Sequence, residues 1–168
     1  MDILELVRTR RSVRQYTNEP VSEEDMNKIL EAGRWAPSAN NSQPWEFVVL
    51  RSREVRKELA GTLTWGRFLS QAALGIVVVI DETASSNPVE DGAAATQNML
   101  LEAHSLGLGA CWIGAYGSAY EANARKVLNV PEHKRLVSII TIGYPAEAPH
   151  KTRKPLVKLV FTDEYGKR

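Results

Sequence analysis

Hydrophobic residues along the chain follow two alternating patterns, one with helical spacing and one with the dense β-branched runs typical of strands. Helical spacing, as in Ile3, Leu6 and Val7, predicts helices over residues 2–10, 22–36, 53–60, 92–106 and 120–128. Denser apolar runs predict strands over residues 45–50, 75–80, 110–115, 136–145 and 157–161. Because strands and helices alternate and the loops between them are short, the pattern indicates an α/β or α+β class, with residues 1–168 as a single domain.

Two of these expected elements stand out by their composition. The run "GIVVVI", Gly75 to Ile80, is β-branched at nearly every position, as in a strand covered on both faces. The helix expected over Gly92–Leu106 has little polar surface, which predicts a buried central helix or an interface helix. The last expected strand, Val157–Phe161, lies far from any obvious partner in the sequence.

The overall composition describes an ordinary globular protein and excludes several classes. The chain is 43% hydrophobic and carries a net charge of +1, which argues against a broad nucleic-acid surface. One cysteine excludes an internal disulfide framework, and no apolar run approaches the roughly 20 residues of a membrane span. The first residues lack the basic region of a secretory signal, so a cytoplasmic protein is expected. The three histidines have no metal-ligand spacing, and no metal site is expected.

The stretch "TRRSVRQY", Thr9 to Tyr16, gathers three arginines and a serine at the end of the first expected helix. One interpretation is a solvated basic helix end, where arginine meets the negative end of the helix dipole. The other is a phosphate clamp, because the planar guanidinium fork matches phosphate and Ser12 adds a hydroxyl donor. A second basic cluster, "HKTRKPL" at His150–Leu156, is either a solvated linker or a second group of cations that binds the same phosphate.

Two further motifs have both an ordinary and a functional interpretation. The stretch "APSANNSQPW", Ala36–Trp45, is either a plain loop or a set of amides and hydroxyls that reads the edge of a heterocycle. The stretch "GLGACWIG", Gly107–Gly114, fails as a dinucleotide fingerprint, because Trp112 stands where the third glycine belongs and a helix precedes it. Gly107 is then a helix C-cap and Gly109 a turn residue, whereas Gly114 at a strand end lets backbone approach a flat ligand.

Two residues with reactive side chains are expected to be structural. His104 lies on the apolar helix and is interpreted as a core histidine with a hydrogen-bond partner rather than as a metal ligand. Cys111 lies in an expected strand with no base near it in the sequence, so a buried small residue is expected.

Five segments, in this order along the chain, resemble the nitroreductase family of FMN-dependent NAD(P)H oxidoreductases. They are "RRSVRQYT", "APSANNSQPWEFVVL", "GAAATQNMLLEAHSLGLGACWIG", "LNVPEHKRLVSIITIGYPAE" and "KTRKPL". The resemblance implies an α+β fold with a mixed, mainly antiparallel sheet flanked by helices. It also implies a homodimer with FMN at the interface, in which the C-terminal strand is exchanged between the subunits.

The resemblance assigns residues to parts of the flavin. The ribityl phosphate would be held by Arg10, Arg11 and Ser12, joined by Arg153 and Lys154. The pyrimidine edge would lie beside Arg14, and the ring would be backed by Trp112, Ile113 and Gly114. The other subunit would supply Pro37, Ser38, Ala39 and Asn41, which would pack on the ring. Trp65, Tyr116 and Tyr120 are either aromatics at the rim of a substrate site or ordinary surface and core aromatics.

The implied function is the transfer of two electrons from NADH or NADPH to nitroaromatic, quinone or similar flat acceptors by a ping-pong mechanism. The flavin supplies the hydride chemistry, so no catalytic side chain is expected and Arg14 only tunes the ring. Two alternatives stay open, an FMN-dependent biosynthetic dehydrogenase and a nucleotide-binding module without redox turnover. Nothing in the sequence distinguishes NADH from NADPH.

Overall fold

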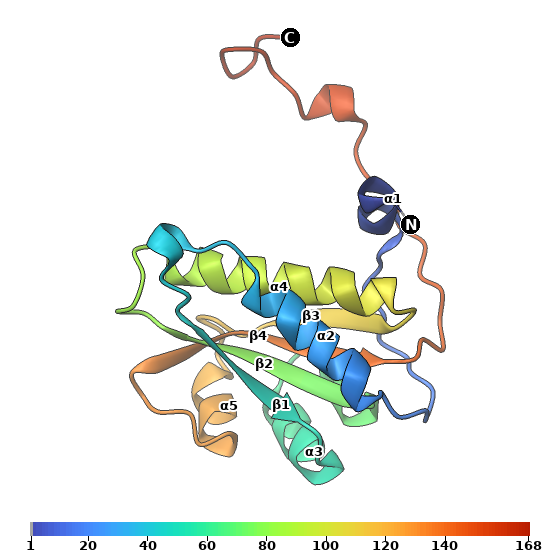
Figure 1. Cartoon of the computed structure of the whole chain (residues 1–168), viewed down its shortest axis with the longest axis vertical. Coiled ribbons are helices and arrows are strands. Elements are labelled where there is room, and N and C mark those ends of the chain that lie inside the picture. The colour runs from blue at the N-terminus through green and yellow to red at the C-terminus, as the bar shows by residue number, and fades with distance from the viewer. Residues whose placement is uncertain (1) are drawn as a thin grey trace.

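A four-stranded antiparallel sheet forms the centre of the computed structural model, which describes residues 2–168 (Figure 1). The strand order is β1-β2-β4-β3, and each neighbouring pair is antiparallel. The strands are β1 (Trp45–Leu50), β2 (Leu74–Asp81), β3 (Gly109–Gly114) and β4 (Lys134–Gly143). The expected α+β class, with an antiparallel sheet flanked by helices, is therefore confirmed.

Five α-helices and three short 3-10 turns complete the described residues, and all five expected helices are present. The helices are α1 (Ile3–Thr9), α2 (Glu23–Arg34), α3 (Arg53–Thr62), α4 (Pro88–Ser105) and α5 (Glu121–Val127), and the 3-10 turns are η1 (Ala39–Asn41), η2 (Arg67–Gln71) and η3 (Leu156–Lys158). Helix α4 begins four residues before the expected Gly92. Its first residue is Pro88, whose fixed φ suits the first position of a helix.

The helices form a layer on each face of the sheet. Helices α2 and α4 cover one face, where their apolar side chains pack against Ile76 and Val78 of β2. Helices α3 and α5 and the η2 turn cover the other face and pack against Val77 and Val79. Strand β2 is thus buried on both faces, as its β-branched sequence predicts.

Helix α4 is the most buried helix of the chain, as expected from its composition. None of its residues from Asp91 to His104 is fully exposed, and Ala95, Met99 and Ala103 are completely buried. Its 18 residues contact α2 and all four strands of the sheet. Within residues 2–168, neither α4 nor another helix combines the length and apolarity that crossing a membrane requires.

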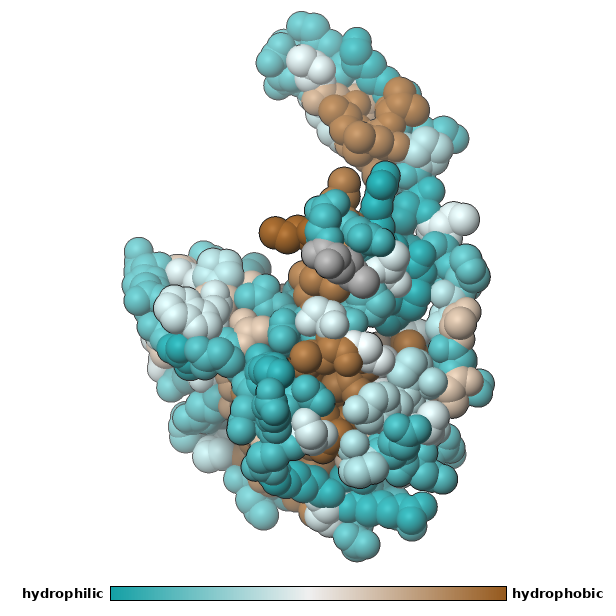
Figure 2. Space-filling model, turned by 45° about the vertical axis from the view of Figure 1, so that its right-hand side comes forward, coloured by the Kyte–Doolittle hydropathy of each residue, from teal (hydrophilic) through white to brown (hydrophobic). Residues whose placement is uncertain are grey.

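Helix α1 and the C-terminal tail protrude from the rest of the chain (Figure 1). The strand expected over Val157–Phe161 is wrong for this chain by itself, because no strand edge lies beside the tail to pair with it. The backbone instead bonds locally in η3, where Leu159 N donates to the carbonyl oxygen of Leu156. The large aliphatic residues that are exposed lie on these two protrusions, where Figure 2 shows hydrophobic surface; they are Ile3, Leu4, Val7, Leu156, Val157, Leu159 and Val160.

Candidate functional site

The basic segment that follows α1 is attached to the free edge of β3. Ser12 forms a parallel bridge with Ala110, and Val13 N donates to the Ala110 carbonyl oxygen at 3.0 Å. The Val13 side chain lies over Gly109, where an added Cβ would come within 2.8 Å of it. The expectation that Gly109 is a turn residue is therefore wrong. It is a strand residue whose missing side chain leaves the space that Val13 occupies.

A second attachment joins the same segment to β4 through Tyr16. The Tyr16 ring lies over Gly143, and its hydroxyl contacts the Val13 carbonyl oxygen at 2.5 Å and Thr141 Oγ1 at 2.6 Å. Burial raises the pKa of this phenol well above its ordinary value, against the effect of the Thr141 hydrogen bond. Tyr16 thus stays neutral, and the backbone from which the arginines project is held against the sheet at two points.

Cationic side chains from both ends of the chain converge next to this backbone. Burial lowers the pKa of Arg10, and the charges of Arg153 and Arg11 lower it further, so both of these arginines act on Arg10 electrostatically. In the part of the chain that the structure describes, no salt bridge joins Arg10, Arg11, Arg14 or Arg153 to a carboxylate. Lys154 is the exposed neighbour of Arg153. Such a cluster of unpaired arginines has the donor set of an anion-binding site.

Cys111 lies beneath this cluster and is only 3% exposed. Burial raises the pKa of its thiol, opposed by Arg14, by a hydrogen bond with Ser12 and by Arg10. The thiol is therefore held in its protonated form. This agrees with the expectation of a buried small residue rather than a nucleophile.

A cavity of about 690 Å³ opens beside the arginine cluster. Its walls are Arg14, Thr64 to Phe68, Cys111 to Gly114, and Tyr120. Gly114 is exposed, and no atom lies within 4 Å of the place where its Cβ would be, so the backbone face at the end of β3 is open. On the opposite wall, Gly66 has a φ of 103° and packs so closely on Ile113 that a side chain there would collide with it.

The three aromatic residues expected at the rim have different surroundings. Trp65 borders the cavity and is 78% exposed. Tyr120 forms part of the wall, but it is buried and its hydroxyl donates to the Gly114 carbonyl oxygen. Tyr116 is not among the residues that line the cavity. Its hydroxyl donates to Glu82 at 2.6 Å, and the Arg135 guanidinium lies 4.4 Å from its ring centroid.

The loop that holds Pro37, Ser38, Ala39 and Asn41 lies apart from the arginine cluster. Ala39 N donates to Asp91 Oδ1 at 3.0 Å, which fixes the loop at the first turn of α4. The basic segment lies at the other end of the same helix, where His104 contacts Thr9 at 2.8 Å. At a rise of 1.5 Å per residue, the 13 steps from Asp91 to His104 span about 20 Å. One chain therefore does not bring this loop to Arg14.

Three residues near Arg14 could not be identified from the sequence. The Arg14 guanidinium lies 5.9 Å from the ring centroid of Phe68, and Arg67 lines the same cavity. Glu147 Oε1 accepts hydrogen bonds from the backbone N–H groups of Arg14, at 2.5 Å, and Gln15, at 3.2 Å. Glu147 is 133 residues from Arg14 in the sequence. The only feature of the sequence that could have pointed to Glu147 is its position shortly after β4. No group of three or more potential metal ligands occurs in residues 2–168.

Comparisons with known proteins agree on one family. Residues 7–66 and 60–144 match the family described as the nitroreductase family. A protein of Archaeoglobus fulgidus, provisionally named NADH dehydrogenase/NAD(P)H nitroreductase, is 41% identical over 151 residues, which are 87% of this chain and 87% of that protein. Among solved structures, an FMN-dependent nitroreductase of Clostridium difficile R20291 is 33% identical with a TM-score of 0.89, covering 97% of this chain and 100% of that one. A provisionally named nitroreductase of Desulfovibrio desulfuricans, solved in complex with FMN, is 36% identical with a TM-score of 0.85 and covers 98% of each chain.

Proposed function

Because the chain belongs to the nitroreductase family, we propose that it is an FMN-dependent NAD(P)H oxidoreductase that passes two electrons to nitroaromatic, quinone or similar flat acceptors. The observation that carries the proposal is the cluster of unpaired arginines beside an open cavity of about 690 Å³. A ligand with an anionic end and a flat ring system suits this combination. The proposal takes residues 1–168 as one FMN-binding domain.

The described side chains fit the two ends of FMN. The phosphate would be held by the clustered donors Arg10, Arg11, Ser12, Arg153 and Lys154. The ring would lie in the cavity against the wall formed by Trp112, Ile113 and Gly114, with Arg14 at its edge. Trp65 would border the acceptor at the mouth of the cavity.

A homodimer completes this arrangement. The loop with Pro37, Ser38, Ala39 and Asn41 lies at the far end of α4 in one chain, so it would reach the ring only from the second subunit. The exposed apolar residues of α1 and the tail are the surfaces that such a dimer would bury. Both features support the proposal that each FMN lies between two chains.

FMN, when bound, supplies the hydride chemistry, and the residues of this chain position it and adjust its charge. The arginine cluster orients the phosphate end, and the wall of β3 excludes water from one face of the ring. The Cys111 thiol is buried and protonated, so it takes no part as a nucleophile. The same open cavity would admit donor and acceptor in turn, as ping-pong kinetics require.

The purified protein tests the proposal directly. We expect a yellow protein whose flavin absorbance is bleached anaerobically by NADH or NADPH and restored by a nitroaromatic or a quinone. A colourless protein that does not take up added FMN would instead favour a nucleotide-binding module without redox turnover. Flavin that neither nicotinamide reduces would favour the biosynthetic dehydrogenase.

Arg14→Gln is expected to lower the two-electron midpoint potential of bound FMN while the phosphate contacts keep the cofactor in place. The ring gains negative charge on reduction, and the variant removes the cation that stabilises it. The expected fall is tens of millivolts, where roughly 30 mV corresponds to about 1.4 kcal/mol. A redox titration measures the potential. The matched variant is Arg67→Gln, which removes another arginine that lines the same cavity. A wild-type potential with only FMN affinity altered would remove Arg14 from the ring.

A further inference from the structure

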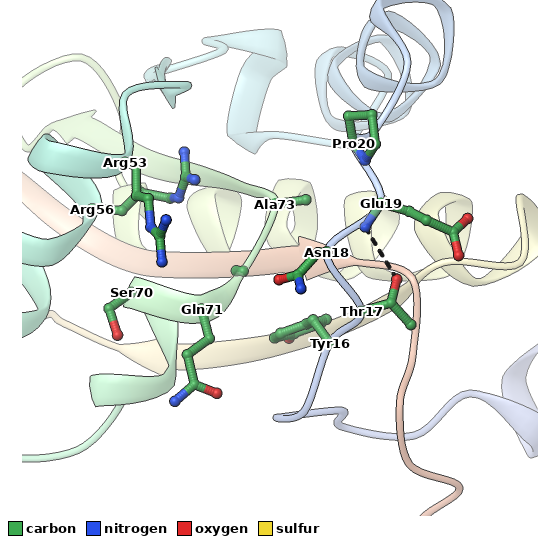
Figure 3. Close-up of a pocket in the computed structure, with 11 residues that line it drawn as sticks. Tyr16, Thr17, Asn18, Glu19, Pro20, Arg53, Arg56, Ser70, Gln71 and Ala73 are labelled. Atoms are coloured by element: carbon green, nitrogen blue, oxygen red, sulfur yellow. Dashed lines mark hydrogen bonds between the residues drawn. The ribbon is translucent and has the colours of Figure 1, made fainter.

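We propose that a second cavity, at the N-terminal turn of α3, binds a small oxyanion that carries a phosphate or carboxylate group. This cavity of about 630 Å³ lies between residues 16–20, α3 and the turn from η2 into β2 (Figure 3). It shares no lining residue with the cavity proposed for the flavin ring. Its size is within the range of sites for small organic ligands.

Arg56 is the central feature of this second cavity. The residue is only 6% exposed, and its Nη1 donates to the carbonyl oxygens of Leu50, at 3.1 Å, and Arg51, at 2.6 Å. These contacts fix the guanidinium but do not neutralise it, and no salt bridge in residues 2–168 pairs it with a carboxylate. Its Nε is buried without a hydrogen-bond partner. A buried charge without a counter-ion is costly, and an anion bound in the cavity would compensate it.

A second guanidinium reaches the same space. Arg53 lies three residues before Arg56, on the same side of α3. Figure 3 shows both side chains extending from the helix into the cavity. Burial lowers the pKa of Arg56 and the charge of Arg53 lowers it further, whereas the charge of Glu54, which does not line the cavity, opposes these effects. The positive end of the α3 dipole adds to the attraction for negative charge.

The remaining walls favour an anion with an attached organic group. The amide side chains of Asn18 and Gln71 supply neutral donors, and Pro20, Ala72 and Ala73 supply apolar surface. Glu19 is the one carboxylate among the lining residues. Figure 3 shows its side chain pointing away from Arg53 and Arg56, so it does not act as their counter-ion.

Calorimetric titration of the FMN-saturated protein with inorganic phosphate, and separately with succinate, tests the proposal. Saturating FMN fills the flavin site, so a remaining phosphate signal comes from elsewhere. We expect saturable binding of at least one of the two anions, weakened at least fivefold in Arg53→Ala. Lys57→Ala removes the same charge from α3 outside the cavity and is expected to bind like the wild type.

The response to each anion identifies the ligand class, phosphate esters or carboxylates. Arg56→Lys keeps the positive charge but loses the planar guanidinium fork, and we expect this variant to bind the anion about tenfold more weakly than the wild type. If Arg56→Lys does not fold, the result for Arg53→Ala tests the proposal by itself. The Arg53 side chain is exposed, so its removal is not expected to disturb the fold. The absence of saturable binding for both anions, or equal weakening in Arg53→Ala and Lys57→Ala, would overturn the proposal.

Discussion

Arg135→Met is expected to lower the free energy of unfolding by about 3 kcal/mol, which corresponds to a fall in Tm of about 6–12 °C. The reason is Glu121, whose side chain is only 5% exposed. Its carboxylate accepts two hydrogen bonds from Arg135, at 2.7 and 2.8 Å, and one each from Gly117 N and Leu136 N. The variant leaves a buried carboxylate without its cation. We expect the low end of the range for such pairs because the Arg135 side chain is 26% exposed.

The effect of Arg135→Met should also depend on pH. Burial opposes the ionisation of Glu121, but the hydrogen bonds from Arg135, Gly117 and Leu136 outweigh it and hold the pKa of Glu121 below its ordinary value. A carboxyl with a lowered folded-state pKa adds stability that is present above its unfolded-state pKa and is lost as the pH falls through the folded-state value. The advantage of the wild type over the variant should therefore shrink as the pH falls below about 4. Urea unfolding at a series of pH values measures it.

The exposed ion pair between Arg34 and Glu31 provides the matched control. Both side chains are 54% exposed, so Arg34→Met is expected to lower the free energy of unfolding much less than Arg135→Met does. The double variant Arg135→Met with Glu121→Gln should be more stable than Arg135→Met alone, because the buried charge is gone. Equal losses in Arg34→Met and Arg135→Met would show that Glu121 does not need its partner.

Arg10→Ala is expected to weaken FMN binding about ten- to a hundredfold. Loss of one charge-assisted hydrogen bond costs roughly 1.5–3 kcal/mol, and Arg10 is a partly buried member of the cluster. The fold should be unaffected, because the two attachments of the segment, Val13 on Gly109 and Tyr16 on Gly143, remain. Titration of the apoprotein with FMN, followed by flavin fluorescence, gives the dissociation constant.

Arg8→Ala is the matched variant for this experiment. Arg8 is an exposed arginine of α1, two residues away, so its loss changes the net charge equally without touching the cluster. Its FMN affinity should stay within about twofold of the wild type. Equal weakening in both variants would point to a general electrostatic effect rather than to a phosphate contact at Arg10.

The fold was predictable where local pattern decides the structure. The β-branched run of β2 indicated a strand buried on both faces. Helical spacing indicated a helix over residues 22–36, and α2 starts directly after Ser22, whose hydroxyl accepts from Asp25 N at 3.0 Å. The expected C-terminal strand failed because a strand needs a neighbour, and residues 157–161 have none in the single chain. The role of Gly109 was missed because Val13, 96 positions earlier in the sequence, determines it.

The candidate site was predictable in its charged groups and not in their supports. Two basic clusters suggested one phosphate, and Arg153 does lie near Arg10. Phe68 and Glu147 carry no local signal, because their contacts with residue 14 depend on how the chain folds. The Arg56 cavity escaped notice for the same reason, since its charge is unusual only once burial is known.

Val13 packs on Gly109, and Tyr16 packs on Gly143, so in each pair the residue accepted at one position depends on the residue at the other. Neither glycine contacts an arginine, yet a side chain at either position would lift the segment that carries Arg10 to Arg14 from the edge of the sheet. Under the proposed function, substitution at these strand positions is therefore limited by FMN binding as well as by folding. A larger residue at position 109 becomes acceptable only together with a smaller one at position 13, so the two sites can change in concert but not one at a time.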